Sequence, residues 1–93
     1  MKTAAFALAF LLLSILPANA EVFQFVDAGN NSYLVYWAVW QSQTLLGYTD
    51  GFGRLRINQP TGTFFVTLKC KGQSDKSTQI TVTGAQTMTQ VRI

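Results

Sequence analysis

The chain carries few side chains of the kinds that perform enzyme chemistry. Its 93 residues include no histidine, a single cysteine and four acidic residues. Histidine-based triads and histidine-containing metal sites are therefore excluded. One cysteine forms neither an intramolecular disulfide nor a thiolate cluster for zinc or iron. The acidic residues are Glu21, Asp27, Asp50 and Asp75.

Three of these acids stand in turn-forming sequences. Asp27, Asp50 and Asp75 each lie within two residues of Gly or Ser, where a short carboxylate commonly caps a turn. Cleavage of a glycosidic bond needs two carboxylates about 5–10 Å apart across a cleft. Only Asp27 and Asp50 offer such a pair, in a chain with little length from which to build a cleft. Together with Asn30 and Asn31, these two aspartates match no calcium-loop spacing, so we expect them to cap turns. We expect no cofactor and no catalytic residue, and the protein is predicted not to be an enzyme.

Residues 1–20 have the composition of an export signal. A lysine at the second position is followed by an apolar run over 4–16 and by small residues at the exit. The run is shorter than the roughly 20 apolar residues that a membrane-spanning helix needs. We predict cleavage between Ala20 and Glu21, a secreted or periplasmic location, and a mature domain of residues 21–93 that does not span a membrane.

The mature region alternates polar and apolar residues with a period of two, and turn residues recur at short intervals. This pattern predicts an all-β fold, a small antiparallel Greek-key β-sandwich of six to seven strands. The expected strands cover 22–26, 33–40, 44–49, 54–57, 63–71, 78–83 and 87–93. The clearest element is a hairpin of 54–57 with 63–71, reversed by a turn that contains Pro60 and Gly62. The predicted interior consists of Leu55, Ile57, Phe64, Val66, Leu68, Ile80 and Val82. Cys70 shares their face, which favours a buried, inert thiol.

Two segments suggest a family. Residues 47–57 read GYTDGFGRLRI and residues 60–66 read PTGTFFV. They resemble the carboxypeptidase regulatory-like family, a transthyretin-like (prealbumin-like) β-sandwich. The first turn of that family is similar to residues 26–30, and its last two strands are similar to residues 80–84 and 91–93. The family carries no catalytic residues in this domain and usually forms part of a larger protein. The resemblance therefore implies a folding, adhesion or assembly module.

The aromatic stretch 33–40 supplies the first candidate contact surface. As one strand it would place Tyr33 and Trp37 on one face and Tyr36 and Trp40 on the other. A sandwich has one core, so one of these pairs must face outward unless an adjoining segment covers it. We predict that the outward set contacts sugar rings or the apolar surface of a partner, and the sequence leaves open which set that is.

The second candidate surface is basic. On the predicted hairpin, Arg54 and Arg56 point outward from one strand, and Lys69 and Lys71 point outward from its neighbour about 4.8 Å away. These residues would form one cationic patch for an anionic polysaccharide, lipid headgroups or nucleic acid. The net charge of the chain is only +3, and +2 without the lysine of the signal, which favours an ordinary solvated face. Nucleic acid is the least expected partner, because no reading helix or binding motif is present.

These observations predict a non-catalytic binding or interaction module. Two alternatives stay open: a structural accessory subunit that packs on a larger cell-envelope or extracellular protein, and a carbohydrate-binding module that uses exposed aromatic residues. A protein partner, a polysaccharide and self-association are all compatible with the sequence. Asn30-Asn31-Ser32 also matches the acceptor pattern for N-glycosylation, and otherwise forms a turn.

Overall fold

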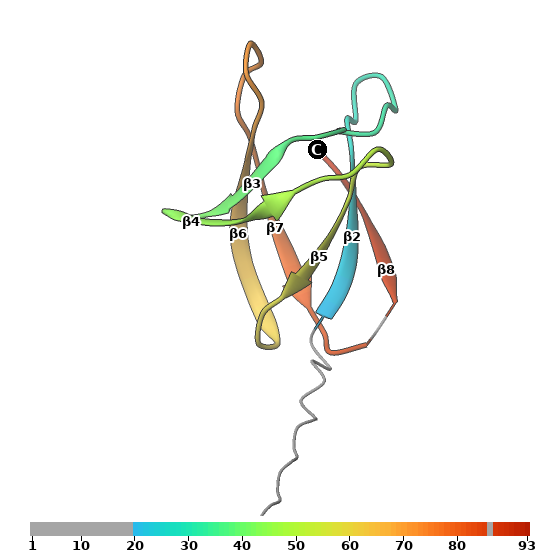
Figure 1. The fold of residues 1–93 in the computed structure, drawn as a ribbon. Helices are drawn as coiled ribbons and strands as arrows, with labels where there is room; N and C mark the ends of the chain where they lie inside the picture. The colour runs from blue at the N-terminus through green and yellow to red at the C-terminus, as the bar shows by residue number, and fades with distance from the viewer. Residues whose placement is uncertain (1–19, 86) are drawn as a thin grey trace, which may run out of the picture.

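The computed structural model describes residues 20–85 and 87–93, which form seven β-strands in two sheets (Figure 1). The strands are β2 (Ala20–Val26), β3 (Ala38–Gln41), β4 (Thr44–Tyr48), β5 (Arg54–Asn58), β6 (Gly62–Lys69), β7 (Lys76–Val82) and β8 (Met88–Arg92). One sheet has the order β5-β2-β8 and the other the order β4-β3-β6-β7. Within the described ranges no helix has the length and hydropathy needed to cross a membrane. The expected signal peptide falls, up to position 19, outside the described residues.

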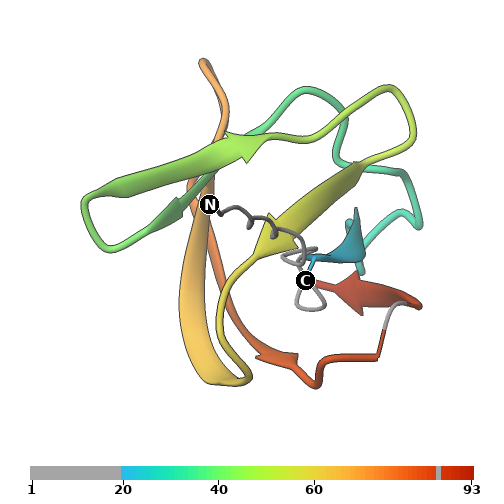
Figure 2. The same ribbon diagram turned by 60° about the horizontal axis from the view of Figure 1, so that its bottom comes forward.

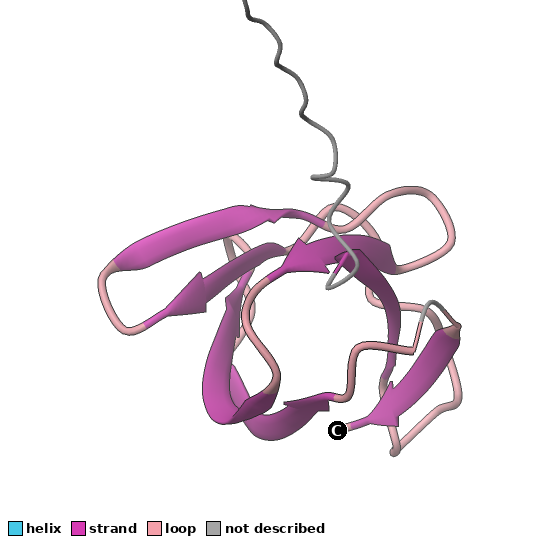
Figure 3. Ribbon diagram, turned by 90° about the horizontal axis from the view of Figure 1, so that it is seen from below, coloured by secondary structure: helices cyan, strands magenta, loops and turns pink. Residues whose placement is uncertain are grey.

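The hydrophobic core lies between the two sheets. Viewed from below, the strands surround one interior (Figure 3), which core side chains from both sheets fill. The buried core consists of Phe23, Phe25, Leu34, Trp37, Val39, Ile57, Val66, Leu68, Ile80 and Val82. Five of the seven predicted interior residues are among these, and the other two, Leu55 and Phe64, pack against them partly buried, as does Cys70. The predicted interior and the two-sheet, all-β fold class are confirmed.

β2 is the central strand of the three-stranded sheet. It pairs antiparallel with β5, where Phe23 lies opposite Leu55, and parallel with β8, where Phe25 lies opposite Val91. The sheet is therefore mixed and not purely antiparallel as predicted. The parallel pair arises because β7 ends, and β8 begins, at the end of the molecule at which β2 also begins (Figure 1).

The predicted hairpin of 54–57 with 63–71 is wrong. β5 pairs with β2 in one sheet, whereas β6 pairs with β3 and β7 in the other. The turn at 59–61 carries the chain from one sheet to the other. Alternation predicts which face of a strand is buried, but two strands on opposite sides of one core bury their apolar faces just as two paired strands do.

The predicted strand 33–40 is also corrected. Only Ala38–Gln41 forms β3, while Tyr33 makes an isolated bridge to Val26 and the chain turns at 35–36. Tyr36 has a φ of 61°, in the left-handed region, so the two-residue alternation is broken there. β3 and β4 form a hairpin that extends beyond the body of the two sheets (Figure 2).

The burial of aromatic side chains predicts a sharp contrast between two phenylalanine substitutions. Phe25 is completely buried, so Phe25→Ala should lower the free energy of unfolding by about 3–5 kcal/mol. Phe65, on the outer side of β6, is exposed, and Phe65→Ala should cost less than about 1 kcal/mol. Urea denaturation of the two variants measures both values. Equal losses would contradict the assignment of the inner and outer faces.

Candidate functional site: an aromatic face on the four-stranded sheet

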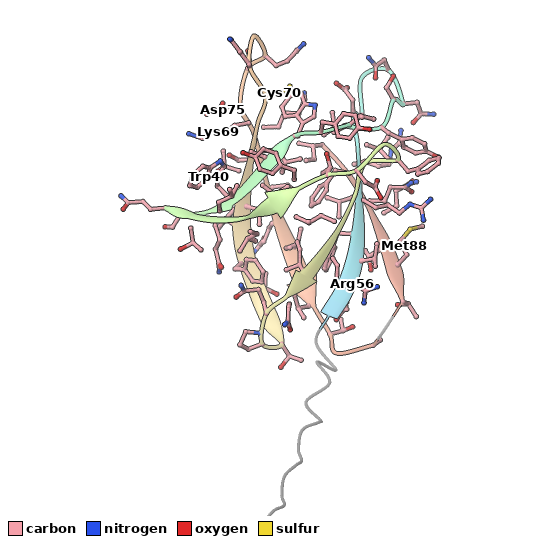
Figure 4. All side chains as sticks on the ribbon, viewed as in Figure 1. Trp40, Arg56, Lys69, Cys70, Asp75 and Met88 are labelled. Carbon is pink, nitrogen blue, oxygen red and sulfur yellow. The ribbon has the colours of Figure 1, made fainter. Side chains whose placement is uncertain are left out.

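The outer side of the four-stranded sheet is set by the alternation of β6. Val66 and Leu68 are buried in the core, so Phe65 and Thr67 point away from it. Trp40 lies opposite Thr67 across the β3–β6 pair and therefore shares the outer side. Figure 4 shows Trp40 on the same side of the sheet as Lys69, the next outward residue of β6.

Three aromatic residues form a diagonal line on this side. Tyr48 on β4 lies opposite Ala38, two residues before Trp40 on β3. Phe65 on β6 is two residues beyond Thr67, in the opposite direction along the sheet. The three residues thus stand on three neighbouring strands, with diagonal steps of about 7–8 Å. We call the surface formed by Tyr48, Trp40 and Phe65 the aromatic face.

The side chains of the aromatic face are accessible. Tyr48 is 62% exposed and Phe65 67% exposed, while Trp40 between them is half-buried. Leu45, directly opposite Trp40, is also exposed. A one-residue bulge in β4 makes this possible, because it lets Leu45 point outward while Leu46 packs against the core.

Neutral polar side chains on β6 and β7 flank the aromatic face. The hydroxyls of Thr67 and Ser77 are 3.1 Å apart, and those of Thr63 and Thr81 are 2.9 Å apart, each pair spanning β6 and β7. Gln79 lies opposite Phe65. These residues present hydroxyl and amide groups, which both donate and accept hydrogen bonds, beside flat aromatic rings.

Among the outward residues on the described strands of this sheet, a charged side chain stands only at one end of the face. There the ammonium nitrogen of Lys69 lies 3.7 Å from a carboxylate oxygen of Asp75. Both side chains are more than half exposed, so this ion pair contributes little to stability. It nevertheless balances the positive charge beside Trp40.

The four predicted aromatic contact residues separate into three environments. Trp40 lies on the aromatic face. Trp37 is only 7% exposed and belongs to the core, so its prediction as a contact residue is wrong. Tyr33 and Tyr36 are exposed, but on the 27–37 loop. Sequence reasoning missed Tyr48, because only the pairing of β3 with β4 shows that it aligns with Trp40.

One buried hydroxyl anchors the second half of the 27–37 loop to the residue that follows β4. Thr49 Oγ1 donates a hydrogen bond to the Leu34 carbonyl at 2.6 Å and accepts one from the Trp37 backbone N–H at 2.8 Å. The Thr49 backbone N–H donates to the Trp37 carbonyl at 2.9 Å. These bonds fix both sides of the turn at which Tyr36, 69% exposed, adopts its positive φ.

The predicted basic patch is not formed. Arg54 and Arg56 lie on β5 in the three-stranded sheet, whereas Lys69 ends β6 in the other sheet and Lys71 follows it. Figure 4 shows Arg56 and Lys69 on these two parts of the fold. The guanidinium carbon of Arg54 lies 4.8 Å from the centroid of the Phe52 ring, so this side chain makes a cation–π contact within its own turn. The patch fails because it depended on pairing between β5 and β6.

The predicted turn-capping role of the aspartates is confirmed for two of them. Asp50 accepts hydrogen bonds from the backbone N–H groups of Arg54 at 2.9 Å and Phe52 at 2.8 Å, which lower the pKa of its carboxyl. Asp27 accepts from the Gly29 N–H at 2.7 Å, which lowers its pKa, and Lys76 at 3.5 Å lowers it further. In the described part of the chain, no three acidic or cysteine residues gather as metal ligands would.

Glu21 has a structural role that the sequence did not indicate. It is buried, and one carboxylate oxygen accepts hydrogen bonds from the backbone N–H groups of Thr83 and Gly84, each at 2.6 Å. The Thr83 hydroxyl lies 3.3 Å from the same oxygen. The contact joins residues 62 and 63 positions apart, so no local pattern signals it.

The Asn30-Asn31-Ser32 segment forms a turn. The backbone N–H of Ser32, in the predicted glycosylation pattern, donates a hydrogen bond to the side-chain oxygen of Asn30.

The comparisons with known proteins add no assignment. The chain matches no protein-family model, and the search of curated proteins finds no similar sequence. The carboxypeptidase regulatory-like resemblance therefore stays a prediction.

The buried hydroxyl of Thr49 predicts an isosteric test of the loop. Thr49→Val removes the donor to Leu34 and the acceptor for Trp37, which leaves two buried backbone groups without partners and should cost at least about 2 kcal/mol of unfolding free energy. Thr49→Ser keeps the hydroxyl and should cost roughly the 1 kcal/mol of one buried methyl group. Chemical denaturation measures both. If the valine variant were as stable as the serine variant, the hydroxyl would not hold the loop.

The lowered pKa values of Asp27 and Asp50 predict acid sensitivity. A carboxyl whose pKa is lower in the folded state stabilises the fold above its unfolded pKa of about 3.9, and this stabilisation is lost as the pH falls through the folded pKa. The melting temperature should therefore fall as the pH is lowered below about 4. Asp50→Asn keeps an oxygen acceptor for the turn but no titrating group, so its melting temperature should fall less steeply. A slope equal to that of the unaltered protein would refute the role of Asp50.

Proposed function

We propose that the protein is an exported, non-catalytic binding module whose contact surface is the aromatic face. The observation that carries this proposal is the alignment of Tyr48, Trp40 and Phe65 on the outside of the four-stranded sheet. Aromatic rings bring large contact area with little side-chain entropy to lose, and they are enriched where proteins bind other molecules. Export rests on the signal-like composition of residues 1–20.

The fold is consistent with this role. A two-sheet β-sandwich is the architecture that the carboxypeptidase regulatory-like resemblance implies, and we propose that the chain is a Greek-key domain of that type. A module of that family contributes binding or assembly without catalytic residues of its own. The absence of histidine from the sequence agrees with a function that needs no general base of that kind.

The residues of the aromatic face are different from the residues that form the core. Trp40, Tyr48 and Phe65 lie outside the core, and the interior side of the same strands carries Val39, Val66 and other buried residues. A ligand on the aromatic face therefore contacts side chains carried by a sheet whose opposite side is fixed in the core. Such preorganisation limits the entropy lost on binding.

The proposal predicts that Trp40→Ala weakens association while an aromatic control does not. The full chain is expressed in a host that exports it, and the purified mature protein is compared by retention on immobilised neutral and anionic polysaccharides and by sedimentation. Whichever association the unaltered protein shows should weaken at least about tenfold in Trp40→Ala, as expected for the loss of one large aromatic contact.

Phe52→Ala is the matched control, because Phe52 is exposed on the 50–53 turn, away from the strands of the aromatic face. It should retain the association. A Trp40→Ala variant that folds and behaves as the unaltered protein in all the assays would overturn the aromatic face as the contact surface. Loss of self-association or of a stable heteromer in that variant would assign the face to the accessory-subunit role.

A further inference from the structure

We infer that the aromatic face binds a linear, uncharged polysaccharide. This inference rests on the proposed function and specifies its ligand. Three features carry it: the alignment of the rings, the hydroxyl and amide groups beside them, and the balance of charge on this side of the sheet.

The alignment favours an extended polymer. Tyr48, Trp40 and Phe65 follow one diagonal with two successive steps of about 7–8 Å, so they mark a line about 15 Å long. A hot spot for a folded protein partner is typically a compact central cluster surrounded by contacts that exclude water. A line of rings instead matches a ligand in which apolar patches repeat along one axis, as the C–H faces of sugar rings do in a linear polysaccharide.

The flanking polar residues fit the hydroxyls of such a polymer. Thr67 and Ser77 continue the row of Trp40 onto β7, and Gln79 continues the row of Phe65. Their hydroxyl and amide groups donate and accept hydrogen bonds, as sugar hydroxyls do. They are placed on the rigid ladder between β6 and β7, beside the rings and not among them.

The charge of the face favours an uncharged ligand over an anionic polymer. Lys69, at one end of the face, is paired with Asp75 at 3.7 Å. Arg54 and Arg56 lie on β5, in the other sheet. No unbalanced positive charge therefore stands among the outward residues of β3, β4 and β6 in the described chain, and charge complementarity points to an uncharged ligand.

The test measures retention of the exported mature protein on cellulose, chitin and mannan as neutral probes and on alginate as an anionic probe. We expect retention on at least one neutral polymer, unchanged between about 50 mM and about 500 mM salt, because no charge pairing contributes. Trp40→Ala and Phe65→Ala should each weaken this retention at least about tenfold, while Phe52→Ala and Arg56→Ala should leave it unchanged. Phe65 is mostly exposed, so its variant tests binding even if Trp40→Ala fails to fold.

Two results would overturn the inference in distinguishable ways. Retention on alginate alone, abolished by salt, or no retention on any polymer, would refute a neutral polysaccharide as the ligand. If Trp40→Ala and Phe65→Ala then still altered alginate retention or sedimentation, the proposed function would stand with a different ligand. If neither variant altered either measurement, the proposed function would fail as well.

Discussion

The register of β6 between β3 and β7 is the constraint on which the candidate site depends. Because successive side chains on a strand point to opposite sides, burying Val66 and Leu68 forces Phe65 and Thr67 outward. The pairing of Thr67 with Trp40 then brings the tryptophan to the same side. A shift of one residue would place Phe65 in the core and Val66 in water, so the hydrophobic effect that folds the domain also aligns its outer aromatic residues.

Long-range hydrogen bonds to buried side chains take the place that disulfides hold in many small domains. A domain of about 70 residues buries only about 60% of its unfolded surface, so few contacts can be lost without unfolding. Glu21 joins the start of β2 to the connection after β7, and Thr49 joins the end of β4 to the turn before β3. Each satisfies backbone groups in segments that lack regular pairing, and an unsatisfied buried group would cost about 1–3 kcal/mol. The connection after β7 and the turn before β3 are therefore fixed by specific bonds.

The sequence predicts the faces of the strands better than their partners. Ile57, Val66 and Ile80 are buried as their alternation predicted, because burial depends only on the period of each strand. Strand pairing depends on loop paths across the core, so the hairpin between β5 and β6 was wrong, and the basic patch that assumed it was wrong too. The prediction of one strand over 33–40 failed for a different reason. Tyr36 takes a left-handed conformation that breaks the alternation. The turn around it is stabilised by Thr49, which is distant in sequence.

The residue types on the aromatic face are not explained by folding alone. Tyr48 and Phe65 keep most of their surface in water, so polar side chains there would leave the core intact. Single exposed aromatic residues are common on protein surfaces. Three aligned on adjacent strands are different, because contiguous apolar surface next to the sheet edge at β4 promotes aggregation. In the proposed function another molecule covers this surface, and the diagonal order of its rings is the reason why we infer an extended ligand.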